Sequence, residues 1–509
     1  MSKKIFLAAF VSMAMAPAAL SAATGPSSAQ SPYLNPSAPG VEFTSILTVG
    51  DEAKKIPGEE GYRMAGIPDG LGAYDNGDGT FTLLMNHELN INSAGVPSGI
   101  VRAHGGAGAF VSKWKIRKSD LKVLNGEDLI KRVFLWDTTN QTYVASSDAV
   151  FIRFCSADLP SPTAFFNKKS GKGFNEGRIF LNGEEEKTDL RPSQRAFAHI
   201  AEGRQQGTTY ELPLMGKGNW ENLLASPSSQ DKTIVIGQDD GGFNKVFIYI
   251  GEKQKKGNPI ELAGLSHGKR YVLAIDGFTT EPGFDPAAAQ FKGSFSLIED
   301  ADGSHGTTLL RPEDGAWDTV DPNRYYFVTT ASITGNSRLW RLTFSDIAHP
   351  ELGGAIEVLV DGNAVASPQI KMMDNIALDK GGDVYLLEDV GNNPRLGQLW
   401  SYGASTRNVT NLGQHDPSRF DPAVSNNLSF LTQDEESSGI IEVTRLFQGV
   451  RGYDTQRNRY FLLDVQAHYP INGANPHGFT NPDELVEGGQ LLLMKIPKEA
   501  TVEEEIESE

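Results

Sequence analysis

The chain has 509 residues and a formal net charge of −18 at pH 7. This excess of carboxylates makes it a poor partner for nucleic acid or anionic lipid. Calcium and other hard cations, in contrast, require oxygen ligands. The chain contains one cysteine, Cys155, which excludes an intramolecular disulfide. A lone thiol is either buried and inert or held by a partner.

Residues 1–23 have the pattern of a secretory signal peptide. Lys3 and Lys4 precede an apolar stretch, and small residues at 21–23 form a cleavage zone. The apolar stretch is broken by Pro17 and is shorter than the roughly 20 residues of a spanning helix. This length argues against the alternative, an uncleaved membrane anchor. We therefore expect a periplasmic or secreted protein with no membrane association after cleavage.

The remaining chain divides by composition. Residues 24–40 are rich in Pro, Ser and Ala and are predicted to be a flexible leader. Residues 41–497 contain no comparable linker, and large β architectures often form one unit, so we expect a single domain there. Residues 498–509 include three consecutive glutamates and are predicted to be an acidic, solvated tail.

Short runs of Val, Ile, Tyr, Phe and Leu alternate with turns rich in Gly, Asn and Asp, as in strands and hairpins. The predicted strands are, in chain order, 81–85, 178–181, 228–237, 245–251, 321–330, 337–344, 383–389, 398–402 and 454–468. Short helices are expected within 119–132 and 190–203.

The spacing is too irregular for a WD40 repeat. Strand units with insertions nevertheless suit an all-β propeller, in which inner strands converge on a channel. A β-sandwich is a less natural alternative for one uninterrupted β run.

Acidic residues follow many of these strands. They are Glu88, Glu184, Glu185, Asp239, Asp240, Asp374, Glu388, Asp389 and Asp464. Carboxylates that converge in a channel repel one another, and bound metal ions relieve this repulsion. The alternative is that each acid caps a turn, where Asp is common. Asn-His-Glu, Glu-Glu-Glu and Glu-Asp are not turn formers of the Asp-Gly kind, which favours a metal site.

The segment RPEDG places Arg311 and Glu313 on the same side of an extended chain. Such a pair could hold a metal through Glu313 and a phosphate through Arg311. The alternative is an ion pair in a loop. A second motif, GLSHG around Ser266, matches G-x-S-x-G, but a strand-like segment follows where a nucleophile elbow requires a helix.

Several segments resemble the PhoX family of bacterial alkaline phosphatases in their order and spacing. They are LLMNHE (83–88), GAFVSKWKI (108–116), RFCSADLP (153–160), FLNGEE (180–185), GNWENLLASP (218–227), VIGQDDGG (235–242), LLRPEDG (309–315), MDNIALDKGGDVYLLED (373–389) and DVQAH (464–468). The resemblance implies a β-propeller, six-bladed in this family, with inserted loops and short helices. It also implies a central site with calcium and iron that hydrolyses phosphomonoesters outside the cytoplasm.

The resemblance also assigns roles to individual residues. Arg311 and Glu313 are expected to be catalytic. The expected metal ligands are Cys155 for iron, with Glu185, Glu221, Glu313, Asp374, Asn86 and Asp239. Asp239 follows Gln238, whereas the family usually has Glu-Asp, and Trp220 stands where the family has a histidine before the residue that matches Glu221.

The sequence therefore predicts a monomeric, metal-dependent phosphatase that uses Ca²⁺, with Fe³⁺ as a further cofactor, on a small phosphate ester. One alternative is a calcium-dependent propeller lactonase or phosphotriesterase. Another is a calcium-stabilised propeller that binds a partner without catalysis. The presence of Cys155, Arg311 and Glu313 together favours the phosphatase, since a binding module has no use for this combination.

Overall fold

The computed structural model describes residues 22–53, 61–285, 290–300, 302–364, 370–425, 429–469, 471 and 482–498. The predicted signal peptide, apart from Ala22 and Ala23, and the predicted tail, apart from Lys498, lie outside these residues. In the part of the chain that is described, no helix combines the length and the apolar composition needed to cross a membrane.

The described chain is built mainly from antiparallel sheets, which confirms the prediction of an all-β fold. One four-stranded sheet contains β6 (Pro68–Asp75), β7 (Thr80–His87), β8 (Phe110–Arg117) and β9 (Val123–Asp128). A five-stranded sheet contains, in spatial order, β11 (Thr142–Ser146), β10 (Arg132–Asp137), β16 (Thr208–Glu211), β15 (Ala196–Ile200) and β14 (Ile179–Gly183).

A nine-stranded sheet joins two antiparallel runs at their outer edges. The first run contains β17 (Trp220–Ala225), β18 (Lys232–Asp239), β19 (Val246–Glu252), β20 (Gly268–Ile275) and β21 (Lys292–Glu299). The second contains β22 (Pro312–Trp317), β23 (Arg324–Thr329), β24 (Arg338–Phe344) and β25 (Gly354–Asp361). Pairing of β21 with β25 links the two runs.

Two further five-stranded sheets complete the main architecture. One contains β26 (Met373–Leu378), β27 (Val384–Glu388), β28 (Gln398–Tyr402), β29 (Val409–His415) and β2 (Leu34–Pro36). The other contains β30 (Glu435–Glu442), β31 (Asn458–Ala467), β32 (Gly488–Pro497), β3 (Glu42–Thr48) and β1 (Ala22–Thr24).

Small elements decorate the loops. The two-stranded sheets are β4 (Glu52–Ala53) with β5 (Tyr62–Arg63) and β12 (Phe166–Asn167) with β13 (Lys172–Gly173). The α-helices are α1 (Pro259–Leu262), α2 (Pro417–Phe420) and α3 (Pro482–Leu485). Short 3₁₀ turns cover Pro162–Ala164, Pro213–Met215, Pro350–Leu352 and Thr444–Phe447.

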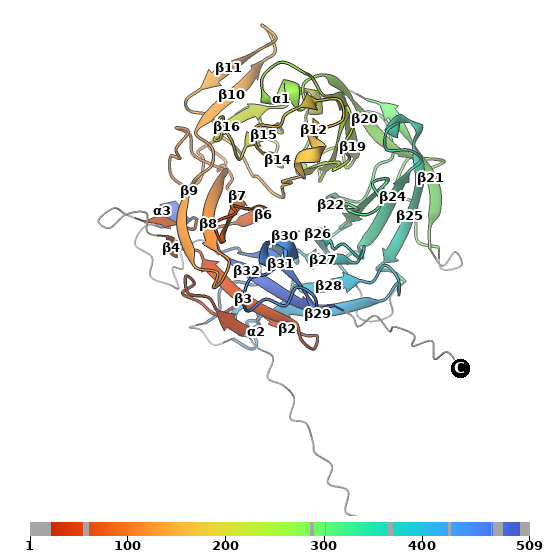
Figure 1. Ribbon diagram of the computed structural model, residues 1–509. Helices are drawn as coiled ribbons and strands as arrows, with labels where there is room; N and C mark the ends of the chain where they lie inside the picture. The colour runs from red at the N-terminus through yellow and green to blue at the C-terminus, as the bar shows by residue number, and fades with distance from the viewer. Residues whose placement is uncertain are drawn as a thin grey trace, which may run out of the picture.

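The sheets lie around a common centre, toward which the edge strands β6, β22, β26 and β30 are turned (Figure 1). Contacts link β14 with β17, β17 with β22, β22 with β26, β26 with β30, and β30 with β6. Apolar side chains fill the spaces between neighbouring sheets, where Trp114, Phe180 and Phe327 are fully buried. Burial of a side chain such as phenylalanine contributes about 1.5–3 kcal/mol, so these wedges hold the sheets together.

Three local predictions are wrong. The two expected helices contain the strands β9 and β15 instead, which pair in register with β8 and with β14 and β16. Pairing in a sheet overrides weak local helical propensity. The leader at residues 24–40 is also not a free segment, because β1 pairs with β3, β2 pairs with β29, and Tyr33 and Leu34 are fully buried.

The chain closes on itself through one sheet. The early strand β3 pairs antiparallel with the late strand β32, and β32 continues through β31 to β30. In Figure 1 the red strand β3 accordingly lies beside the blue strands β31 and β32. This pairing places residues from both ends of the described chain in one sheet.

Candidate metal centre

Five inner strands interrupt their regular pairing at the same level. The register shifts lie at 68–71 in β6, 220–222 in β17, 312–315 in β22, 373–376 in β26 and 438–441 in β30. Such bulges re-aim side chains and are common near active sites. Each of the first four shifts contains a buried acid of the cluster, namely Asp69, Glu221, Glu313 and Asp374, and the shift in β22 also contains buried Asp314.

The inner edge of the β14 sheet is formed by an irregular segment rather than by a regular strand. Isolated bridges join Phe154 to Glu184 and Asp158 to Leu181. Cys155 lies between these bridges, so it occupies the same inward position in its sheet as the acids occupy in theirs. It is the only cysteine, and it is buried.

A backbone irregularity precedes four of these inward residues. The residue two positions earlier has a positive φ in each case: Ile67 (50°) before Asp69, Arg153 (51°) before Cys155, Arg311 (56°) before Glu313, and Met372 (52°) before Asp374. Non-glycine residues in this region cost about 1–3 kcal/mol each and cluster at functional sites. The repeat marks the same turn on four sheets.

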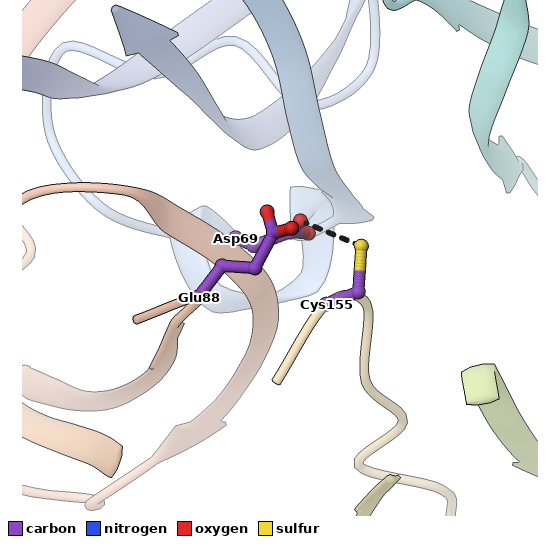
Figure 2. A group of neighbouring side chains, drawn as sticks. All are labelled: Asp69, Glu88 and Cys155. Atoms are coloured by element: carbon purple, nitrogen blue, oxygen red, sulfur yellow. Dashed lines mark hydrogen bonds between the residues drawn. The ribbon is translucent and has the colours of Figure 1, made fainter. Parts of the chain in front are cut away.

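The inward residues converge into connected groups of potential metal ligands. One ligand atom from each member lies within 4.8 Å of the others in Asp69–Glu88–Cys155, in Cys155–Glu185–Glu221 and in Glu221–Glu313–Asp374. Figure 2 shows the first group, in which the Cys155 thiol donates to Asp69 Oδ2 at 3.3 Å. Cys155 and Glu221 each belong to two groups, which joins all three into one cluster.

Other polar side chains in and around this cluster follow or end the second strand of a sheet. Glu88, Glu185, Asp240 and Asp389 come just after β7, β14, β18 and β27. From β31, Gln466 Nε2 donates to Asp69 Oδ2 at 3.0 Å and to Glu88 Oε2 at 2.9 Å. Five sheets therefore supply these residues.

Glu436 on β30 adds a further buried carboxylate. It accepts a hydrogen bond from Ser438 Oγ at 2.6 Å, and its backbone forms an isolated bridge with Asp389. Repulsion from Asp389, Asp374, Asp69 and Glu88 adds to the effect of burial on its pKa. Glu436 therefore belongs to the same acidic assembly.

The electrostatics of the cluster are unfavourable without a cation. Burial, followed by neighbouring acids, holds the pKa values of Asp69, Glu221, Glu313 and Asp374 well above the usual range. Burial likewise raises the pKa of Glu185 to about 8, although Arg153 opposes this shift. The pKa of the Cys155 thiol is raised by burial and by Asp69. A bound cation would reverse these shifts.

The residues present fit calcium and iron. Buried oxygens that have no hydrogen-bond donor among the described residues include Glu185 Oε2, Glu221 Oε1 and Gln466 Oε1. Orphaned buried acceptors are costly, and these three lie in or beside the shared ligand groups. Carboxylate oxygens suit calcium, and a thiolate beside carboxylates suits iron.

Two arginines border the acidic cluster. Arg311 Nε and Nη2 donate to Asp240 at 2.9 and 2.7 Å, and its Nη2 lies 2.9 Å from Glu313 Oε1. Arg311 and Glu313 thus lie close together, and their contact is the ion pair that was the alternative interpretation of this segment. Arg153 Nε contacts Glu88 at 2.5 Å, and its Nη1 contacts Glu185 at 3.2 Å.

Five predicted site residues, Cys155, Glu185, Glu221, Glu313 and Asp374, lie in the cluster, and Arg311 lies at its border. Two others do not join it. Asn86 donates to the carbonyls of Cys155 and Ser156 and accepts from Asn182, so it anchors the segment that carries the thiol. Asp239 accepts from the backbone N–H groups of residues 219, 243 and 244. The acid that reaches Arg311 is the next residue, Asp240.

Four residues of the site were not predicted as such, namely Asp69, Glu436, Gln466 and Arg153. Gln466 and Arg153 lie within the segments DVQAH and RFCSADLP, so the resemblance included their positions but not their roles. Asp69 stands before a glycine, as a turn residue would, and Glu436 lies in a long polar stretch. Neither carries a local signal that separates it from a loop acid.

Comparison with known proteins finds a similar fold but no match by sequence. No protein-family model matches the chain, and no curated protein matches its sequence. The structure matches Pseudomonas fluorescens PhoX in complex with vanadate, a transition-state analogue, with a TM-score of 0.60 at 11% identity. The match covers 90% of this chain and 95% of that chain. The chain has a PhoX-like fold.

Other solved structures match less well. The N10 neuraminidase-like protein of A/little yellow-shouldered bat/Guatemala/060/2010 gives a TM-score of 0.36 at 10% identity and covers 88% of this chain and 98% of that one. The exo-β-1,3-galactanase 1,3Gal43A from Clostridium thermocellum gives 0.31 at 11% identity, with 90% and 62% covered. These low TM-scores carry no argument about this chain.

Proposed function

We propose that this protein is an exported, metal-dependent phosphatase that hydrolyses phosphomonoesters at the acidic cluster, on a six-bladed β-propeller. One observation carries the proposal: a buried thiol and carboxylates from several sheets form one cluster, and the guanidinium of Arg311 lies against it. The PhoX-like fold supports it, because the matched protein was solved with vanadate, a transition-state analogue.

The arrangement of the inner strands supports the proposed six blades. The inner edges are formed by six segments: β6, β17, β22, β26, β30 and the segment that carries Cys155. The nine-stranded sheet supplies two of these edges, β17 and β22. Each blade then sends one side chain inward, from Asp69, Cys155, Glu221, Glu313, Asp374 and Glu436. A propeller suits such a site because its inner strands converge on the centre.

The chain's own residues have distinct roles in this proposal. Glu185, Glu221, Glu313, Asp374 and Asp69 would hold calcium, and Cys155 would hold iron beside them. When bound, these metals would neutralise phosphoryl charge and activate the attacking oxygen. Asp240 fixes the guanidinium of Arg311 through two hydrogen bonds. The oriented guanidinium then stabilises negative charge on a phosphoryl oxygen.

Substitutions at Arg311 and Glu313 test the proposal. Glu313→Gln keeps the side-chain volume but removes a buried negative charge, so it should lose metal and nearly all turnover. Arg311→Lys keeps a positive charge but loses the planar fork. It should therefore retain metal and lose activity by about 10²-fold or more. Elemental analysis and a phosphomonoester assay, with and without chelator, measure both effects.

Asp239→Asn provides a matched control next to Asp240. Its carboxylate is occupied by backbone N–H groups rather than by Arg311. The substitution should leave metal content unchanged, whereas Asp240→Asn should lower activity as Arg311→Lys does. Phosphomonoester hydrolysis at the parental rate in both Glu313→Gln and Arg311→Lys would refute the assignment.

A further inference from the structure

The two arginines at the edge of the cluster are held in the same way. Each has a positive φ, each lies two residues before an inward ligand, and each contacts two acids of the assembly. Arg153 is bound by Glu88 and Glu185, and Arg311 by Asp240 and Glu313. Paired carboxylates of this kind orient a guanidinium and limit its rotation.

Each arginine keeps one terminal nitrogen without a partner in the described structure. The contacts of Arg153 use Nε and Nη1, which leaves Nη2, and those of Arg311 use Nε and Nη2, which leaves Nη1. Neither Arg153 Nη2 nor Arg311 Nη1 is among the buried atoms that lack a partner, so both nitrogens are accessible to solvent. The side chains are 37% and 35% exposed, whereas Arg195, which pairs with buried Glu184, is 5% exposed. Arg195 is a structural ion pair, while Arg153 and Arg311 reach solvent.

The two guanidinium groups occupy separate positions. They share no contacting carboxylate: Arg153 contacts Glu185 and Arg311 contacts Glu313, and these two acids belong to different ligand groups that have only Glu221 in common. Arg153 lies at the Cys155 side of the cluster and Arg311 at the Glu313 side. Two separated, solvent-facing donors suit two anionic groups better than the oxygens of one phosphoryl group.

We propose that Arg153 forms a second anion-binding position, so that the site takes phosphate esters whose leaving group carries another anionic group, a carboxylate or a second phosphate. This inference rests on the proposed function, in which Arg311 binds the phosphoryl group to be hydrolysed. Arg153 then selects the leaving group and contributes to KM more than to kcat.

Binding of inert phosphonates tests this inference without turnover. The probes are butylphosphonate, which has no second anion, phosphonobutyrate, which adds a carboxylate, and trimethylene diphosphonate, which adds a second phosphonate. By titration calorimetry on the metal-loaded protein, one or both of the probes with a second anionic group should bind at least about tenfold more tightly than butylphosphonate. The probe that gains distinguishes a carboxylate from a phosphate as the second group.

Arg153→Gln should abolish this preference, so that the three probes bind within about twofold of one another. Arg311→Lys should weaken all three probes together. Because removal of Arg153 leaves Glu88 and Glu185 without their cation, Arg153→Lys is the second variant. It keeps the charge but loses the fork, so it should retain metal and fold and still lose most of the preference. Arg117→Gln, in an exposed ion pair with Asp120, is the control for arginine loss.

The outcomes separate the two proposals. The second anion-binding position is overturned if the parent binds the three probes equally, or if both Arg153 variants keep the preference. Neither result bears on the proposed hydrolysis of phosphomonoesters. If the metal-loaded parent neither binds butylphosphonate nor hydrolyses phosphomonoesters, the proposed function itself fails. The two probes with a second anionic group could instead chelate the metal directly. Their tighter binding would then survive Arg153→Gln, and this result would count against the inference.

Discussion

At the scale of single residues, Cys155 has surroundings that an inert cysteine would not have. A free buried cysteine usually packs as a small apolar side chain. Here the thiol donates to Asp69, and Glu88, Glu185 and Glu221 all lie in the same ligand groups. Burial, followed by these acids, raises the pKa of the thiol and keeps it protonated unless a cation compensates. A metal ligand is therefore the role that best accounts for a thiol in this position.

Replacement of the thiol tests this role. Cys155→Ser should lose iron and the thiolate-to-iron charge-transfer absorption, while calcium bound by the carboxylates remains. The side chain is nearly isosteric, so the unfolding midpoint of the metal-free protein should change little. Elemental analysis and the visible spectrum of parent and variant measure the effect. Equal iron contents in the two proteins would mean that Cys155 is only a core residue.

Glu185 makes the stability of the metal-free protein depend on pH. Burial raises its folded pKa to about 8 from an ordinary value of 4.5. Between these values the folded state binds more protons than the unfolded state, so stability falls as pH rises through this window and returns as pH falls. The urea midpoint of chelated protein should therefore decrease from pH 5 to pH 8, and Glu185→Gln should flatten this decrease. A midpoint that rises over the same range would contradict this reading.

At the scale of elements, the strands were predictable and the bulges were not. Runs such as 245–251 and 337–344 are strongly β-forming, and they appear as β19 and β24. Acids that follow second strands, such as Glu88 and Asp389, were also visible, because a polar residue after an apolar run marks the end of a strand. Asp69 was not visible, since only pairing with β7 turns Pro68-Asp69-Gly70 into a bulge.

The bulge in β30 depends on one glycine. Gly439 has φ 61°, and a Cβ there would lie 3.0 Å from Asp464 Oδ2, from the backbone oxygen of Asp69 and from Leu71 Cγ. Gly439→Ala should therefore destabilise the fold and weaken metal binding through displacement of Asp69. We expect a loss of about 2–4 kcal/mol, from backbone strain together with overpacking, measured by urea unfolding.

Gly449→Ala is the matched control, because Gly449 also has a positive φ, 76°, but a Cβ there would meet nothing within 4 Å. It should carry only the backbone penalty of about 1–2 kcal/mol and leave metal affinity unchanged. Equal losses of stability and equal metal contents in the two variants would show that the bulge does not position Asp69.

At the scale of the whole molecule, the acids tie metal binding to folding. Several sheets place buried carboxylates in one cluster, in a chain of net charge −18. Calcium that binds only the folded protein should stabilise it by about 2.7 kcal/mol when its free concentration is 100 times Kd. Thermal unfolding at fixed ionic strength, with calcium or with chelator, measures this effect. A midpoint that does not move would mean that the acids are ordinary strand-end residues.

Closure of the ring through β3 and β32 also sets an order of events during synthesis. Glu436 and Gln466 lie on β30 and β31, and this sheet is complete only when residues 488–497 have been made and have paired with residues 42–48. A nascent chain on the ribosome therefore exposes an incomplete set of ligands, however many of its earlier sheets have formed. We therefore expect the proposed centre to be loaded after synthesis, from the metal supply that the finished chain meets after its release.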